Sequence, residues 1–386
     1  MNIEFQISKP VLEWIADKQA KDIITLAQEF VADEKKIEKF LNGLVTKSQA
    51  KDLAKLAKIP FGFLFLDKPP EMVRPTLPDF RNTLKAEPLS NNFYEVLEDI
   101  NNKIDWYKDF LREEDILDKL DFVGRFDYNK SRPEDVAKDI AMSIGFDIRT
   151  KLNNLGNKDN YLSELVSSFE SIGILVFQSG IVKNNTKKPL SVKEFRGFAI
   201  TDIYAPAVFI NNKDEKSAQL FTLLHEVAHL WIGQEGISDW DGKNHTEKFC
   251  NQVAAYFFMP DDMFITEWQK KAKVDDNKFN IIYEISKFFK ISALATTIKA
   301  VHLNLIPSFY INEVRKQIDE QLLKNKNKNS GGNPYASFPL RNSKRLTKII
   351  LTQALNQHIL LTDAAKLLNL KPTTVMELYS KMQDQF

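Results

Sequence analysis

The sequence predicts an α+β protein that is mostly helical and contains more than one folded unit. Apolar residues recur at helical spacing through most of its 386 residues. Short apolar runs of the kind that form strands are confined to 173–177, 195–200 and 207–210. A hydrophobic content of 43% is enough for two or three cores. We therefore expect a small three-stranded sheet among helices.

Composition excludes several classes of protein. The formal net charge of +1 gives no global attraction to nucleic acid or membrane. No stretch approaches the roughly 18 apolar residues that a membrane span needs. The N-terminus has neither the basic flank nor the apolar run of a signal peptide. A single cysteine, Cys250, fits a reducing compartment. We expect a cytoplasmic protein with no membrane partner, and the frequent Phe, Asn and Lys indicate an A+T-rich bacterial genome.

Residues 1–70 predict a helix-turn-helix module. Five short helical segments lie between residues 10 and 66, and Asp33 and Ser48 stand at capping positions. The segment that would read DNA offers Lys35, Lys36 and Lys39 among acidic residues, and it lacks the Arg and Gln that commonly contact bases. Residues 1–70 hold 11 lysines, no arginine and 10 acidic residues, a net charge of +1. A dimerisation or protein-interaction role is the alternative to DNA binding.

The rest of the chain predicts five further segments. We expect a helical linker region over 71–150, with prolines at its start and Pro-Asp-Phe-Arg at 78–81, and a central domain over 151–265. Helical periodicity predicts a helix-turn-helix-like unit over 266–323. The Lys/Asn/Gly-rich stretch within 324–340 predicts a flexible linker, and 341–386 a final helical unit. Arg341, Lys344 and Arg345 make this tail locally basic, so it is the second place where DNA contact is expected.

The central domain contains His225-Glu226-Val-Ala-His229 on a predicted helix that ends at Gly233. Four residues advance a helix by slightly more than one turn, so both histidines lie on one face. Two neutral imidazoles placed in this way can bind one Zn²⁺, and Glu226 beside them can take a proton from water. The alternative is a pair of structural core histidines. That pair would place two of the chain's five histidines at a buried position without a purpose.

A catalytic zinc site needs a third protein ligand. Glu247 stands in the first turn of the next predicted helix, 18 residues after His229, where a helix–loop–helix can return it to the metal. His245 is the rival ligand and a candidate auxiliary group. We prefer Glu247, because a helical residue is held more firmly than one in the preceding loop. Its alternative role is that of an ordinary first-turn glutamate, favoured there by the helix dipole.

Four blocks of the sequence are similar, in order and spacing, to the motifs of a known protein family. They are 194–199, 209–211, 219–230 and 247–260, and in this order they resemble an ImmA/IrrE-type metallopeptidase. The resemblance implies a zincin-like α+β domain in which His225, His229 and Glu247 bind zinc and Glu226 is the general base. The stretches 11–14 to 42–43 and 53–60 resemble the XRE/Cro-like family, which is often fused ahead of this peptidase type. In characterised relatives the peptidase cuts a repressor protein and so releases transcription.

The sequence therefore predicts a zinc endopeptidase that cleaves a protein partner, such as a transcription repressor, in a regulatory, mobile-element or stress-response context. The alternative is a non-hydrolytic transcription regulator, or an antitoxin-like protein with a toxin partner, that retains the peptidase fold. Glu226 distinguishes the two, because a purely structural zinc site needs no base beside it.

Overall fold

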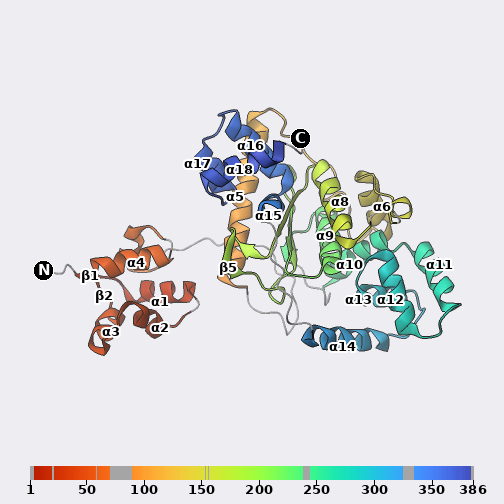
Figure 1. The fold of residues 1–386 in the computed structure, drawn as a ribbon, viewed down its shortest axis with the longest axis horizontal. Coiled ribbons are helices and arrows are strands. Elements are labelled where there is room, and N and C mark those ends of the chain that lie inside the picture. The colour runs from red at the N-terminus through yellow and green to blue at the C-terminus, as the bar shows by residue number, and fades with distance from the viewer. Residues whose placement is uncertain are drawn as a thin grey trace. The chain divides into compact units, whose positions relative to one another are not determined.

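The computed structural model describes residues 4–19, 21–57, 59–69, 89–152, 154, 156–237, 244–324 and 334–383. The chain divides into two compact units, Met1–Pro75 and Thr76–Phe386, each with its own hydrophobic core. Both are mostly helical with small sheets, so the predicted α+β class is confirmed (Figure 1). In the described ranges we find no helix whose length and hydropathy would let it span a bilayer.

The first unit is a small helical bundle with a two-stranded ribbon. Its elements are β1 (Glu4–Gln6), α1 (Lys9–Lys18), α2 (Ile23–Phe30), α3 (Glu34–Leu41), β2 (Leu44–Thr46), α4 (Lys47–Ala57) and the 3₁₀-helix η1 (Phe61–Phe65). The five predicted helical segments are confirmed. Strands β1 and β2 pair antiparallel, with Phe5 opposite Val45. This ribbon was not predicted, because strands of three residues are too short to show alternation.

The second unit is organised around a four-stranded sheet in the order β3-β7-β6-β8. Its strands are β3 (Leu175–Ser179), β6 (Gly197–Ile200), β7 (Ala207–Asn211) and β8 (Gly236–Ile237). Strand β3 runs parallel to β7, whereas β6 is antiparallel to both β7 and β8. The three predicted strands are confirmed. The fourth, β8, has two residues and gives no periodic signal.

Both faces of this sheet are covered by helices. Alternate strand residues point to opposite sides. Val176, Val208 and Ile210 pack with helices α8 (Lys158–Ser171), α9 (Lys216–Ile232) and α10 (His245–Phe258). Phe177, Phe198 and Phe209 face the other way, toward α5 (Asn91–Glu113) and the C-terminal helices (Figure 1). The sheet is therefore the shared middle layer of two apolar cores.

The remaining elements complete the helical layers. They are α6 (Pro133–Ser143), α7 (Ile148–Lys151), α11 (Asp261–Ala272), α12 (Lys278–Phe289), α13 (Ala293–His302), α14 (Phe309–Lys324), α15 (Pro334–Arg341), α16 (Lys344–Leu355), α17 (Leu361–Leu367) and α18 (Pro372–Gln383). A hairpin of β4 (Ile181–Val182) and β5 (Asn185–Pro189) projects beside the sheet. The prediction of a flexible linker over 324–340 is wrong from residue 334 on, because α15 begins there. Residues 325–333 lie outside the described residues, as do the predicted motif at 78–81 and its neighbouring prolines.

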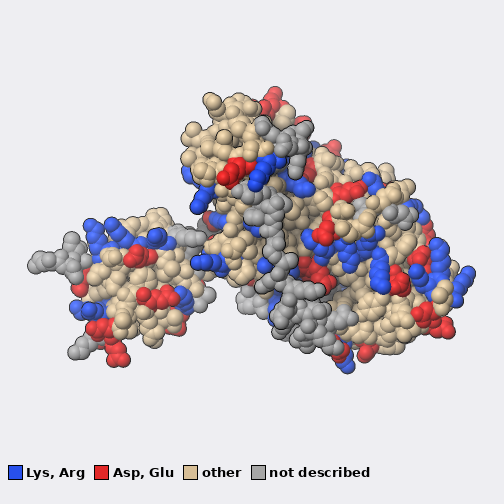
Figure 2. All heavy atoms as spheres, in the orientation of Figure 1, with Lys and Arg blue, Asp and Glu red and all other residues tan. Residues whose placement is uncertain are grey.

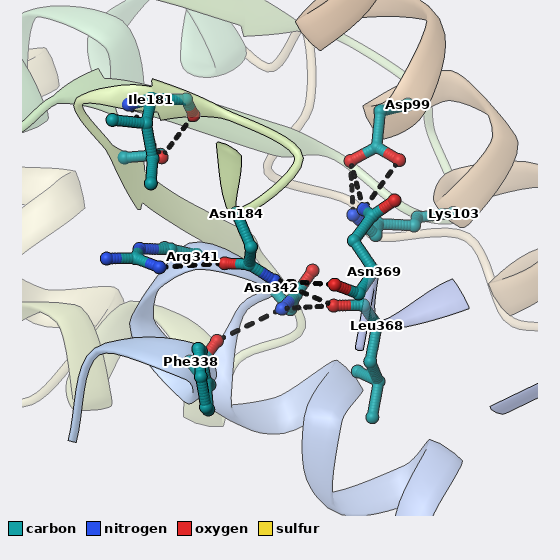
Figure 3. Close-up of polar contacts among 10 residues, drawn as sticks. Asp99, Lys103, Ile181, Asn184, Phe338, Arg341, Asn342, Leu368 and Asn369 are labelled. Carbon is teal, nitrogen blue, oxygen red and sulfur yellow. Dashed lines mark hydrogen bonds and ion pairs between the residues drawn. The ribbon is translucent and has the colours of Figure 1, made fainter. Parts of the chain in front are cut away.

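Polar side chains join the C-terminal helices to the rest of the second unit (Figure 3). Asn184, in the β4–β5 turn, donates to the carbonyls of Leu368 and Asn369 at 3.2 and 3.0 Å and accepts from Arg341 at 2.8 Å. The Asn369 amide donates to Asp99 on α5 at 2.9 Å, and Asp99 also pairs with Lys103. The contacts of Asn184 and Asn369 link segments between 157 and 270 residues apart. The C-terminal helices are therefore built into the second unit.

Candidate metal centre

Helix α9 carries the His-Glu-x-x-His motif and is buried from Ser217 to Ile232. Strands β6 and β7 pack on it, as do helices α8 and α10. The helix ends at Gly233 in the left-handed conformation, with φ of 64°, as predicted. Two N–H groups of an earlier loop close its last turn: Gly124 donates to Leu230 at 2.8 Å and Phe126 to Trp231 at 3.0 Å. The end of the helix that bears His229 is therefore fixed on several sides.

His225, His229 and Glu247 converge as predicted. The two Nε2 atoms are 3.2 Å apart, and each lies 3.1 Å from one carboxylate oxygen of Glu247. All three residues are buried. Among the described residues they are the group whose ligand atoms lie close enough together, within 4.8 Å of one another, to hold a metal ion. Helices α9 and α10 thus bring together residues that the sequence separates by a loop.

The outer nitrogen of each imidazole has an acceptor. His229 Nδ1 lies 3.0 Å from the backbone oxygen of Gln234, and His225 Nδ1 lies 2.9 Å from Asn251 Oδ1. A carbonyl oxygen can only accept a hydrogen bond, so each Nδ1 carries the proton and each Nε2 is left with a lone pair. This is how proteins commonly orient histidine ligands of metals.

The protonation states also suit a metal. Burial alone would raise the pKa of Glu247, but the neighbouring His225 and His229 outweigh it and lower this pKa to about 2. Burial lowers the pKa of His229 below its usual value. Glu247 is therefore an anion and His229 is neutral, which are the forms that bind a metal. Burial opposes a charge on His225 as well, but the Glu247 carboxylate outweighs it and raises the pKa of His225, so a proton and a metal ion compete for its Nε2.

A cation would provide a partner for the Glu247 carboxylate and for the Nε2 atoms of the two histidines. Both carboxylate oxygens of Glu247 are buried, and no described residue donates a hydrogen bond to them. Two imidazole lone pairs point at the same place. An anion and two acceptors without a donor are costly in a buried site unless a positive ion lies between them. Two histidines and one carboxylate are a ligand set of catalytic zinc.

Glu226 follows the first ligand directly and lies fully buried on α9. Its neighbour on the strand side is Gly197 at the start of β6. A Cβ atom at residue 197 would lie 2.8 Å from Glu226 Oε1. The carboxylate of Glu226 therefore occupies space between the metal helix and the sheet, one residue from His225.

The structure separates His245 from the three ligands. His245 is exposed, and its ring lies 5.6 Å from that of Tyr128, which also contacts Phe249. Residues 245 and 249 share one face of α10, while Glu247 and Asn251 share the other. Cys250 is buried, and burial raises the pKa of its thiol well above the usual value. Cys250 is therefore a small buried hydrophobe rather than a reactive thiol.

The residues considered for DNA contact lie far from this centre in the sequence. Lys36 and Lys39 are exposed on α3, whereas the side chain of Lys35 lies outside the described part. In the C-terminal unit, Arg345 donates to Tyr107 and to the Glu170 carbonyl, both at 3.0 Å. Arg341 donates to Asn184 at 2.8 Å, and Lys344 lies 3.5 Å from Ser163 Oγ. Cationic and anionic side chains are interspersed on the face drawn in Figure 2.

Three contributors were not assigned a role from the sequence. Asn251 orients His225, the Gln234 carbonyl orients His229, and Gly197 faces Glu226. For Asn251 a signal existed, because it lies four residues after Glu247 and so shares its helix face. The other two depend on a backbone carbonyl and on packing between a strand and a helix, which no motif reveals.

Comparison with known families covers this centre. Residues 169–300, which include all three ligands and Glu226, match the peptidase family model described as an IrrE N-terminal-like domain. Residues 342–381 match a domain of unknown function, DUF8813. A search of curated proteins finds no match to the chain. The family match and the buried His–His–Glu group together support an ImmA/IrrE-type peptidase domain within this chain.

Proposed function

We propose that this protein is a zinc-dependent endopeptidase that cleaves a protein partner. The observation that carries the proposal is the convergence of His225, His229 and Glu247 in a buried site with Glu226 beside it. Each histidine is oriented through its outer nitrogen, as in a metal site, and the peptidase family match spans all four residues. These features support peptide hydrolysis better than a core histidine pair.

The reaction follows from the residue types. Zinc held by the three ligands would supply a Lewis acid that polarises the scissile carbonyl and acidifies the attacking water. Glu226 takes the proton from that water as its oxygen adds to the carbonyl carbon. The carbon–nitrogen bond then breaks, and Glu226 passes the proton to the leaving amine. His225 and His229 keep their protons on Nδ1 throughout, because the Nδ1–H groups donate hydrogen bonds to Asn251 Oδ1 and to the Gln234 carbonyl.

The partner we propose is a repressor-like protein, acted on in a cytoplasmic regulatory setting. Support comes from the resemblance to ImmA/IrrE-type peptidases and from the separate helical unit Met1–Pro75. We propose a helix-turn-helix role for that unit, in partner binding or dimerisation. DNA contact through Lys36 and Lys39 or through the C-terminal tail is the second role to test.

The test compares wild type with Glu226→Gln and Glu247→Ala. We expect about one zinc per chain by mass spectrometry in wild type and Glu226→Gln, and a loss of zinc in Glu247→Ala. Cleavage of casein and of repressor-like proteins encoded beside the gene is expected from wild type alone.

Two results contradict the proposal. A Glu226→Gln protein that still cleaves would exclude Glu226 as the base. Folded wild type that binds zinc but cleaves nothing, with Glu226→Gln identical to it in every assay, would instead support a regulator or antitoxin-like protein with a structural metal.

A further inference from the structure

Strand β6 begins with a glycine at the point where the sheet touches the metal helix. A Cβ atom added to Gly197 would lie 2.7 Å from Thr222 Cγ2, 2.8 Å from Glu226 Oε1 and 2.8 Å from the backbone oxygen of Phe209. Cβ atoms in proteins essentially never come within 3.0 Å of such neighbours. The φ of Gly197 is outside the left-handed range, so backbone freedom does not explain this glycine. Space explains it.

The three neighbours differ in how far they can move. The Phe209 oxygen belongs to strand β7, paired with β6. Thr222 is buried on α9, and its β-branched side chain has little rotational freedom. Glu226 stands one helical turn after Thr222, and its carboxylate ends a flexible side chain. A side chain at position 197 would therefore compete with the carboxylate of Glu226 for one place.

We propose that Gly197 is a positioning residue for Glu226. The absence of a side chain at Gly197 leaves room for the Glu226 carboxylate beside β6, while His225 and His229, on the neighbouring face of α9, form the proposed metal site. The strand thus permits a carboxylate position for the proposed base that a side chain at residue 197 would exclude. The catalytic meaning of this placement rests on the proposed peptidase function, whereas the contact itself does not.

The contact is tested without substrate by a double-mutant cycle of thermal unfolding with Gly197→Ala and Glu226→Ala. If the added methyl group meets the Glu226 carboxylate, Gly197→Ala lowers the Tm in wild type and lowers it clearly less in the Glu226→Ala protein. An equal loss of Tm in both backgrounds overturns the proposal. If Gly197→Ala alone does not fold, the same cycle is run with Thr222→Ser, which removes the 2.7 Å methyl contact.

The catalytic consequence needs a second readout. Gly197→Ala/Thr222→Ser should keep about one zinc per chain, yet lose kcat on the order of 100-fold with little change in KM, since a misplaced base costs about that much. Gly62→Ala is the control, because a Cβ there meets nothing within 4 Å. Wild-type kcat in the double variant overturns the positioning role. If the wild type has no peptidase activity, the proposed function is contradicted. The contact between Gly197 and Glu226 is still tested, because the unfolding cycle needs no activity.

Discussion

Each histidine of the proposed metal centre donates a hydrogen bond from Nδ1 to another part of the protein and directs Nε2 into the site. His225 is oriented by a side chain, that of Asn251, and His229 by the backbone carbonyl of Gln234. A side-chain substitution can remove the first acceptor but not the second. The part that orientation plays in metal affinity can therefore be measured at Asn251.

We expect Asn251→Ala to weaken zinc binding by roughly 10- to 100-fold, because His225 loses the acceptor that fixes its tautomer. Asn251→Asp keeps an oxygen at the same position and should bind zinc at least as tightly as wild type. Competition titration against a chelator measures all three affinities. Equal affinities in all three proteins would show that the 2.9 Å contact does not orient the ligand.

At the scale of elements, the end of α9 couples helix geometry to the metal ligands. Gly233 has a positive φ, and the N–H of Gln234 donates to the carbonyl of His229 at 3.1 Å. In return the Gln234 carbonyl accepts from the imidazole of His229. The residue that ends the helix therefore also places the acceptor for a ligand.

Gly233→Ala should lower both stability and zinc affinity. A non-glycine residue with positive φ costs about 1–2 kcal/mol, and the added Cβ would lie 3.0 Å from Gly124 Cα. Gly145→Ala is the matched control, because Gly145 has a φ of 60° and nothing within 4 Å of its Cβ position. Unfolding and zinc titration should show a loss of stability in both variants and a loss of affinity in Gly233→Ala only. The same zinc affinity in the two variants would refute the coupling.

A buried acid connects two helices of the second unit. Glu170 on α8 accepts a hydrogen bond from Ser343 at the start of α16. Burial raises the pKa of Glu170, although the hydrogen bond from Ser343 acts against this. The folded protein therefore favours the protonated acid. Its contribution to stability is complete below the usual pKa of 4.5 and is lost as the pH rises through the raised value.

Glu170→Gln should therefore raise the Tm at pH 7, because glutamine keeps the carbonyl oxygen for Ser343 without a buried charge. The gain should shrink as the pH falls below 4.5, where the wild-type acid is also neutral. Glu98→Gln, at an exposed position on α5, is the control and should change the Tm little. Thermal unfolding across this pH range decides the matter; a gain that does not depend on pH would contradict the assignment.

At the scale of the whole molecule, the two units differ in which parts of the chain build their hydrophobic cores. The Met1–Pro75 unit packs a core of its own from α1 to η1. The two cores of the other unit share one sheet, and the second of them contains residues of α5 and of α16–α18. Removing one end of the chain should therefore have a different effect from removing the other.

We expect residues 76–386 alone to stay soluble and bind zinc as the full chain does. Residues 1–333 should aggregate, because they lose the helices that cover Leu175, Phe177 and the apolar face of α5. Solubility and zinc content of the two truncated proteins, measured beside the full chain, check this. A soluble 1–333 protein with an unchanged Tm would show that the C-terminal helices contribute nothing to the stability of the sheet.

Sequence reasoning found the features that repeat or that bring reactive groups together in short segments. Helical spacing predicted α9, its end at Gly233 and the shared face of His225 and His229. The place of Glu247 followed from the next helix start. The helical character of 71–150 and 341–386, where α5 and α16 lie, was also predicted, since both regions show several turns of apolar periodicity.

The rest depends on contacts that no local pattern records. Strand β8 has two residues, so its pairing with β6 is set by the position of the chain after α9. The role of Gly197 depends on a helix that follows it in the sequence and crosses its strand. The union of the C-terminal helices with the sheet rests on contacts such as Asn369 to Asp99, across 270 residues. Such information lies in packing, which periodicity cannot supply.

Helices α16–α18 follow the proposed metal ligands in the sequence, and this order has a consequence for synthesis. During translation the metal ligands, the last of which is Glu247, emerge well before Leu346 and Leu378 can reach the sheet. For that interval the nascent chain carries its proposed ligands on a sheet whose second face is covered by α5 but not yet by α16–α18. Docking of α16–α18 on the sheet, rather than completion of the ligand set, is then the step at which we expect this unit to become stable. A premature stop codon within α14 would leave a polypeptide with all three proposed ligands but without the helices that complete the cover of this sheet face.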